Sequence, residues 1–75
     1  MVSPADFVYA IHRVRACYAD DPGLSVPIRG LARLSGVRID VCTAAVTVLN
    51  KEGFLHRRRD DAWVLAADVD VARYR

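Results

Sequence analysis

The sequence predicts a mainly α-helical domain that ends in a small two-stranded β-hairpin. Apolar residues recur at helical spacing in three segments, and prolines or glycines separate these segments from one another. Near the C-terminal end, a basic run and a tryptophan-led apolar run flank Asp60-Asp61, which is typical of two strands joined by a turn. We therefore expect one domain over residues 1–75, with helices at 3–19, 27–35 and 40–52, a hairpin at 54–66 and a tail at 67–75.

The first helix has a clear start and a clear stop. Ser3 is a good N-cap residue, and Pro4 suits the first helical position because its missing N–H would have no partner there. The run Asp20-Asp21-Pro22-Gly23 ends the helix. Between these ends, one face carries an apolar stripe at spacings of four, three and four residues: Phe7, Ile11, Val14 and Tyr18.

Glycines close the two helices that follow. A short extended segment, 24–26, leads to the second helix, which Gly36 ends, and the third helix ends at Gly53. Many residues of the third helix are β-branched, which lowers its intrinsic helix propensity. We still predict a helix because its apolar stripe follows helical spacing and burial overrides propensity: Cys42, Ala45, Val46 and Leu49.

The register of the hairpin depends on the length of its loop. A two-residue turn at Asp60-Asp61 would place Arg58 opposite Trp63 and His56 opposite Leu65. A longer loop would shift that register, and the sequence does not decide between the two. In either case we expect Phe54 and Leu65 to be buried against the third helix.

Composition indicates a globular chain, with 53% apolar and 27% charged residues. No apolar run approaches the roughly 20 residues needed to span a bilayer, and no basic segment precedes an apolar stretch at the N-terminus. We therefore expect a cytoplasmic protein without membrane insertion. Cys17 and Cys42 are too few for a disulfide scaffold or a four-thiolate metal site, and we expect them to be small buried hydrophobes.

The sequence gives little support for catalysis. His12 and His56 lie on separate elements, without a cysteine or serine at a recognisable catalytic spacing. The chain also contains no glycine-rich phosphate loop and no metal-ligand spacing. We therefore expect no enzyme activity, no cofactor, no metal and no small-molecule ligand.

The segment IRGLARLSGVRIDVCTAAVTVLNKEGFL followed by HRRRDDAWVLA, Ile28 to Ala66, resembles the winged helix-turn-helix family. It is similar to bacterial MarR-like regulators and to the cytoplasmic winged-helix tail of YihY-type membrane proteins, in which a WVLA strand before an acidic, apolar segment looks like Trp63–Val71. The resemblance implies three helices, a two-stranded wing and double-stranded DNA as partner, in transcription control. It also implies a set of core positions, all apolar here: Leu31, Ala32, Val37, Cys42, Ala45, Val46, Leu49 and Phe54.

In DNA-binding relatives the third helix enters the major groove and the wing arginines contact phosphates or the minor groove. The outward face of the third helix is expected to carry Asp40, Val41, Thr43, Ala44, Thr47, Val48 and Lys51. Between Ile39 and Asn50 this helix has no arginine, lysine, asparagine or glutamine for bidentate base contacts. Thr43 and Thr47 can donate to phosphate or contact a thymine methyl, and Ala44 can do only the latter. The predicted DNA-binding residues are Arg29, Arg38, Thr43, Ala44, Thr47, Arg57, Arg58 and Arg59.

Two alternatives remain open at this level. The arginines could only solvate an edge strand and balance nearby aspartates, which is a common protection against aggregation. The domain could also be a protein–protein interaction module without specific DNA binding, because the outward Val41, Ala44 and Val48 would suit a protein surface. On the first helix, Tyr9, Arg13 and Ala16 form a face that could pair with a second copy to give a homodimer.

Overall fold

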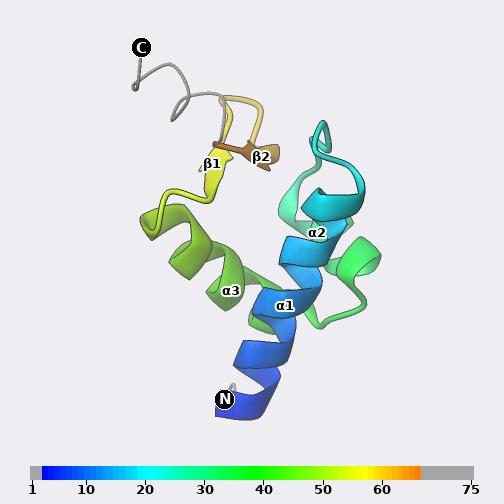
Figure 1. The fold of residues 1–75 in the computed structure, drawn as a ribbon, viewed down its shortest axis with the longest axis vertical. Helices are drawn as coiled ribbons and strands as arrows, with labels where there is room; N and C mark the ends of the chain where they lie inside the picture. The colour runs from blue at the N-terminus through cyan, green and yellow to red at the C-terminus, as the bar shows by residue number, and fades with distance from the viewer. Residues whose placement is uncertain (1–2, 67–75) are drawn as a thin grey trace.

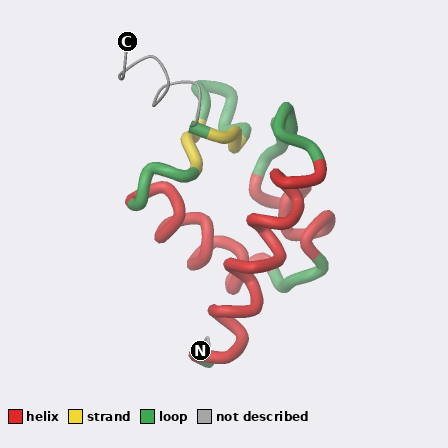
Figure 2. The backbone as a smooth tube through the Cα atoms, in the orientation of Figure 1, coloured by secondary structure: helices red, strands yellow, loops and turns green. Residues whose placement is uncertain are grey.

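A computed structural model describes residues 3–66, which form three helices and one antiparallel two-stranded sheet (Figures 1 and 2). The predicted mainly helical class with a terminal hairpin is confirmed, whereas the predicted tail lies outside the described residues. Within those residues, no helix is both long and apolar enough to cross a membrane. The elements are α1 (Pro4–Asp20), α2 (Ile28–Ser35), α3 (Ile39–Lys51), β1 (Leu55–Arg57) and β2 (Trp63–Leu65).

The ends of the helices follow the signals in the sequence. The Ser3 hydroxyl oxygen accepts the Asp6 N–H at 3.1 Å, and Pro4 opens α1. Gly36 follows α2 in the left-handed conformation, with φ of 73°, and its N–H donates to the Ala32 carbonyl at 3.0 Å. A side chain at Gly36 would be strained, so the glycine is what allows α2 to stop and the chain to turn into α3.

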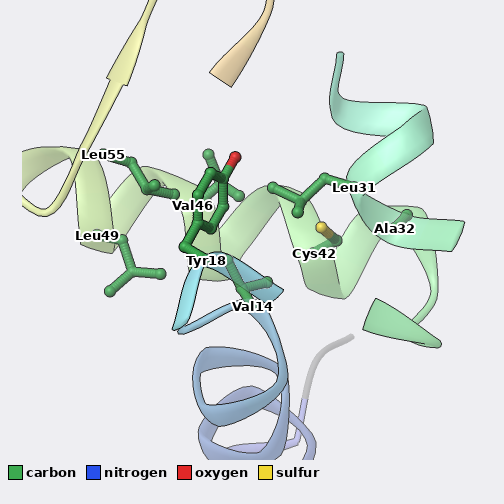
Figure 3. Packing of buried hydrophobic residues seen from close by; sticks show 8 residues of the cluster. All are labelled: Val14, Tyr18, Leu31, Ala32, Cys42, Val46, Leu49 and Leu55. Carbon is green, nitrogen blue, oxygen red and sulfur yellow. The ribbon is translucent and has the colours of Figure 1, made fainter. Parts of the chain in front are cut away.

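The core lies where the three helices and β1 meet (Figure 3). Tyr18 is the largest of its fully buried side chains and stands between α3 and the hairpin. A second, smaller cluster of Ala10, Val41 and Ala45 forms where the N-terminal half of α1 crosses α3. The main cluster takes its buried members from four elements: Val14, Tyr18, Leu31, Ala32, Cys42, Val46, Leu49 and Leu55.

The loop of the hairpin is longer than two residues. Arg58 donates its N–H to the Ala62 carbonyl at 2.8 Å, and Asp61 donates to the Arg58 carbonyl at 3.0 Å. Asp61 adopts a positive φ of 66°, which aspartate tolerates better than most residues. This is a turn followed by one left-handed residue, the usual three-residue connection. Of the two alternatives that the sequence left open, the structure has the longer loop and its shifted register.

The observed register pairs Leu55 with Leu65 and Arg57 with Trp63. A shift of one residue moves each side chain to the opposite face of a strand. Consequently Leu55, with 1% of its surface exposed, is the strand residue buried in the core. Phe54 and Leu65 pack against that core but are only half-buried, so the expectation that both are buried is met in part.

Trp63 ties the hairpin to the body of the domain. Its N–H donates to the Val26 carbonyl at 2.7 Å, so the short segment before α2 forms an isolated antiparallel bridge with β2. Its carbonyl accepts the Tyr18 hydroxyl at 2.8 Å. Because both backbone groups of Trp63 are bound to other elements, the hairpin is held in one orientation relative to α1 and to the segment before α2.

Candidate nucleic-acid interface

The middle of α3 presents a narrow, mostly apolar outer face. Thr43 and Thr47 are exposed, and Ala44 and Val48 flank them, half-buried. Val41, by contrast, is only 7% exposed and packs with Ala10 and Ala45. The prediction that Val41 faces outward is therefore wrong. Val41 lies one helical turn before the core residue Ala45, and α1 covers that turn.

Both threonine hydroxyls of this face are bonded within the helix. Thr43 Oγ1 donates to the Ile39 carbonyl at 2.7 Å, and Thr47 Oγ1 donates to the Thr43 carbonyl at 2.8 Å. A hydroxyl has a single hydrogen to donate. Each threonine therefore offers a partner its methyl group and the remaining lone pairs of its oxygen, and it offers no donor.

A shallow groove of about 400 Å³ lies between α2 and the start of α3. Its walls combine two arginines with an apolar floor: Arg29, Arg33, Ala32, Val37 and Ile39. Within residues 3–66 neither arginine takes part in an ion pair. Arg33 is absent from the predicted site. Its spacing of four residues from Arg29 places both on one face of α2 and could have identified it.

Arg38 stands at the N-terminal boundary of α3, as expected. Its Nη2 lies 3.3 Å from Asp40 Oδ2, and the side chain is 83% exposed. The other oxygen of Asp40 accepts the Val41 N–H at 2.9 Å. Asp40 is therefore occupied in stabilising the first turn of α3, where a carboxylate favours the positive end of the helix dipole.

The wing arginines, Arg57, Arg58 and Arg59, surround the hairpin loop. Arg57 Nη1 lies 3.9 Å from Asp61 Oδ1, and Arg58 Nε lies 4.0 Å from Asp60 Oδ1. Arg59 has no ion-pair partner in the part of the chain that the structure describes. All four paired side chains are more than half exposed, and such long surface pairs contribute about 0–1 kcal/mol. A phosphate could displace these aspartates at small cost.

The predicted face of α1 is less uniform than its sequence indicates. Tyr9 is 56% exposed and its neighbour Val8 is 52% exposed, while Ala16 is also at the surface. Arg13, however, donates from Nε to the Ser35 carbonyl at 3.0 Å. Arg13 therefore connects α1 to the end of α2, and only Tyr9 and Ala16 of the predicted set remain uncommitted.

Neither cysteine has the environment of a reactive thiol. Burial raises the pKa of the Cys42 thiol, and it also raises the pKa of the half-buried Cys17. Both are free cysteines. Among the described residues, no three histidine, cysteine, aspartate or glutamate side chains gather closely enough to hold a metal ion.

No protein-family model, no curated protein and no solved structure matches this chain. The surface residues described above are therefore the basis on which a function can be assigned.

Proposed function

We propose that this chain is a winged helix-turn-helix domain that binds double-stranded DNA, with α3 in the major groove and arginines on the phosphates. The observation that carries this proposal is the position of the arginines relative to the exposed face of α3. Arg29, Arg33 and Arg38 surround its N-terminal end, and Arg57, Arg58 and Arg59 lie on the hairpin that follows its C-terminal end. Arginine suits phosphate because its planar fork of donors binds two oxygens at once.

The order of the elements supports the winged arrangement. A helix, a short bridged segment, two further helices and a hairpin follow one another along the chain. The bridge between Val26 and Trp63 gives the hairpin a third, short neighbour, and Tyr18 anchors it from α1. A wing held in this way can present its loop arginines at a fixed distance from α3, which phosphate contacts at a defined register require.

Charge is distributed unevenly over the described surface. At the start of α3, three arginines stand near two aspartates, Asp40 and Asp6, and Asp40 is engaged by the helix itself. On the hairpin, three arginines face Asp60 and Asp61 through long, exposed contacts. The end of α1 carries the acidic pair Asp20-Asp21, and within residues 3–66 neither carboxylate takes part in an ion pair. The two groups of arginines favour approach of a polyanion to α3 and the wing.

The alternative of a protein-docking face on α3 is weaker after the burial of Val41. Of the three apolar residues expected to form that face, Val41 is enclosed by α1, and Ala44 and Val48 are each half-buried. Of the expected set, Ala44 and Val48 are therefore left at the surface, whereas protein interfaces are marked by large contiguous apolar patches. A face for self-association is better provided by Val8 and Tyr9 on α1, and we include a homodimer in the proposal.

The test is a titration of a fluorescently labelled generic duplex at two salt concentrations, followed by anisotropy. Replacing Arg57, Arg58 and Arg59 together with alanine should weaken binding to every duplex by a similar factor. The slope of log affinity against log salt should become shallower by about 0.9 for each phosphate that the variant no longer neutralises. A wild-type domain that binds no duplex even at low salt would refute the proposal.

A second pair of variants separates a local effect from net charge. Asp60→Asn/Asp61→Asn removes the acidic partners of the wing arginines and keeps the loop. Asparagine at position 61 tolerates the positive φ, and the Oδ1 of asparagine at position 60 can still accept the Ala62 N–H. This variant should bind duplex more tightly. Asp20→Asn/Asp21→Asn changes the net charge equally at the end of α1, outside the wing loop, and should have a smaller effect. Equal effects would contradict a specific role for the wing.

A further inference from the structure

The two exposed threonines of α3 act as methyl-bearing side chains without a free donor, because their own helix binds their hydroxyls. Thr43 and Thr47 donate their hydroxyl hydrogens to the carbonyls one turn earlier, at 2.7 and 2.8 Å. These bonds also select the side-chain rotamer, because threonine in a helix chooses its χ1 by this contact. The methyl group of each is thereby held in one position instead of exchanging with the hydroxyl.

No other side chain on this stretch replaces the missing donors. Between Asp40 and Val48 the exposed and half-buried side chains are a carboxylate, two threonines, an alanine and a valine. The first amide of the following turn, on Asn50, donates to the Leu55 carbonyl at 2.9 Å and holds the wing. The middle of α3 therefore offers a partner methyl groups and oxygen lone pairs.

This surface selects among the base edges of the major groove. Guanine presents two acceptors there and needs a donor, which the middle of α3 lacks. Thymine presents a 5-methyl group, and its paired adenine presents an amino donor beside it. 5-Methylcytosine presents the same methyl group next to its own amino donor. Methyl groups on the helix can pack on these methyl groups while a threonine oxygen accepts from the amino group.

We propose that α3 reads the 5-methyl groups of pyrimidines in duplex DNA through Thr43 and Thr47. This inference rests on the proposed function. DNA is the occupant that the charges select, because arginines stand at both ends of the same helix, Arg38 before it and the wing arginines after it. Four helical residues advance about 6 Å along the axis, and bases on one strand are about 3.4 Å apart, so the two threonines reach methyl groups about two base steps apart.

The experiment measures the affinity of the wild-type domain for matched duplexes that differ only in the methyl group. An A·T-rich duplex is compared with the same duplex carrying uracil in place of thymine, and a G·C duplex with its 5-methylcytosine form. Burial of one methyl group corresponds to roughly a fourfold change in dissociation constant, so two such groups give roughly 15-fold. Weaker binding to the uracil duplex would show that α3 reads the methyl group of thymine. Tighter binding to the methylated G·C duplex would show that it reads 5-methylcytosine. Either result supports the inference.

Two substitutions locate the methyl groups on the protein. Thr43→Ser/Thr47→Ser keeps both hydroxyls and their bonds to the helix but removes the methyl groups, so discrimination should disappear while binding to the unmethylated duplex stays the same. Thr43→Val/Thr47→Val keeps the methyl groups and should retain discrimination. Equal circular dichroism spectra and thermal midpoints establish that all three proteins are folded alike.

The outcomes separate this inference from the function on which it rests. A wild-type domain that binds no duplex at low salt overturns the proposed function. A domain that binds all duplexes with equal affinity, or whose discrimination survives the serine variant, leaves DNA binding intact and overturns methyl reading alone.

Discussion

The bond between Tyr18 and Trp63 gives a quantitative prediction about how the wing is held. The Tyr18 hydroxyl donates to the Trp63 carbonyl at 2.8 Å, and only 1% of the Tyr18 surface is exposed. Tyr18→Phe removes one oxygen and keeps the ring, including its edge contact with Phe54 at 6.4 Å between centroids. The substitution therefore tests the hydrogen bond with little change in packing.

The expected loss of stability follows from the carbonyl that is left without its donor. Leaving a buried polar group unpaired costs about 1–3 kcal/mol, and the site is only partly enclosed, so we expect about 1–2 kcal/mol at neutral pH. For a domain of this size, each kcal/mol lowers the thermal midpoint by about 4–8 °C. Urea unfolding followed by circular dichroism measures the global loss, and fluorescence of Trp63, the single tryptophan of the chain, reports on the wing.

The same tyrosine makes this difference depend on pH. Burial raises the pKa of Tyr18 from 10.0 to about 12 in the folded protein. Because the folded pKa exceeds the unfolded one, its contribution to stability is complete below pH 10 and is lost as the pH rises through 12. By pH 11 the loss amounts to about 1.4 kcal/mol. The advantage of the wild-type protein over Tyr18→Phe should therefore shrink to near zero at that pH.

Two results would show that this reasoning is wrong. A Tyr18→Phe variant as stable as the wild-type protein at neutral pH would mean that the bond to Trp63 contributes nothing. A stability difference that stays constant between pH 8 and pH 11 would mean that the Tyr18 hydroxyl titrates like an exposed phenol.

Two further predictions concern the thiols and the first helix. Cys42 is fully buried and burial raises its pKa, so iodoacetamide should modify it only after urea unfolds the domain. The half-buried Cys17 should react slowly in the native state. Rapid modification of Cys42 in the native protein, detected by peptide mass spectrometry, would contradict its buried position. If α1 forms the dimer contact through its exposed Tyr9, sedimentation at micromolar concentration should give a dimer that Tyr9→Ala dissociates. A monomeric wild-type protein would rule the dimer out. A dimer that the substitution does not affect would place the contact elsewhere.

Local signals in the sequence predicted where the helices begin and end. Ser3 caps α1 because its hydroxyl accepts the N–H of a residue only three positions later in the chain. Gly36 ends α2 because glycine adopts the left-handed conformation without strain. The helical stripe of α3 also predicted its buried residues despite their low helix propensity, since spacing along a helix determines which side chains share a face. These features involve neighbours within about one helical turn, which the sequence shows directly.

Features that depend on distant segments could be decided only by the tertiary structure. Val41 is buried because α1 crosses α3 at that turn, and Arg13 is occupied because the end of α2 lies beside it. The register of the wing follows from the left-handed conformation of Asp61. The sequence allowed either a two-residue turn or a longer loop, so it did not determine this register.

The candidate site divides in the same way. The sequence by itself determined which residue types it contains: arginines before and after the third helix, and threonines in place of bidentate base readers. The structure added Arg33 to the groove with Arg29 and showed that the hydroxyls of Thr43 and Thr47 are bonded to α3 itself. The physical reason is that a residue type fixes which donors and acceptors exist, whereas the folded neighbours determine which of them remain available to a partner.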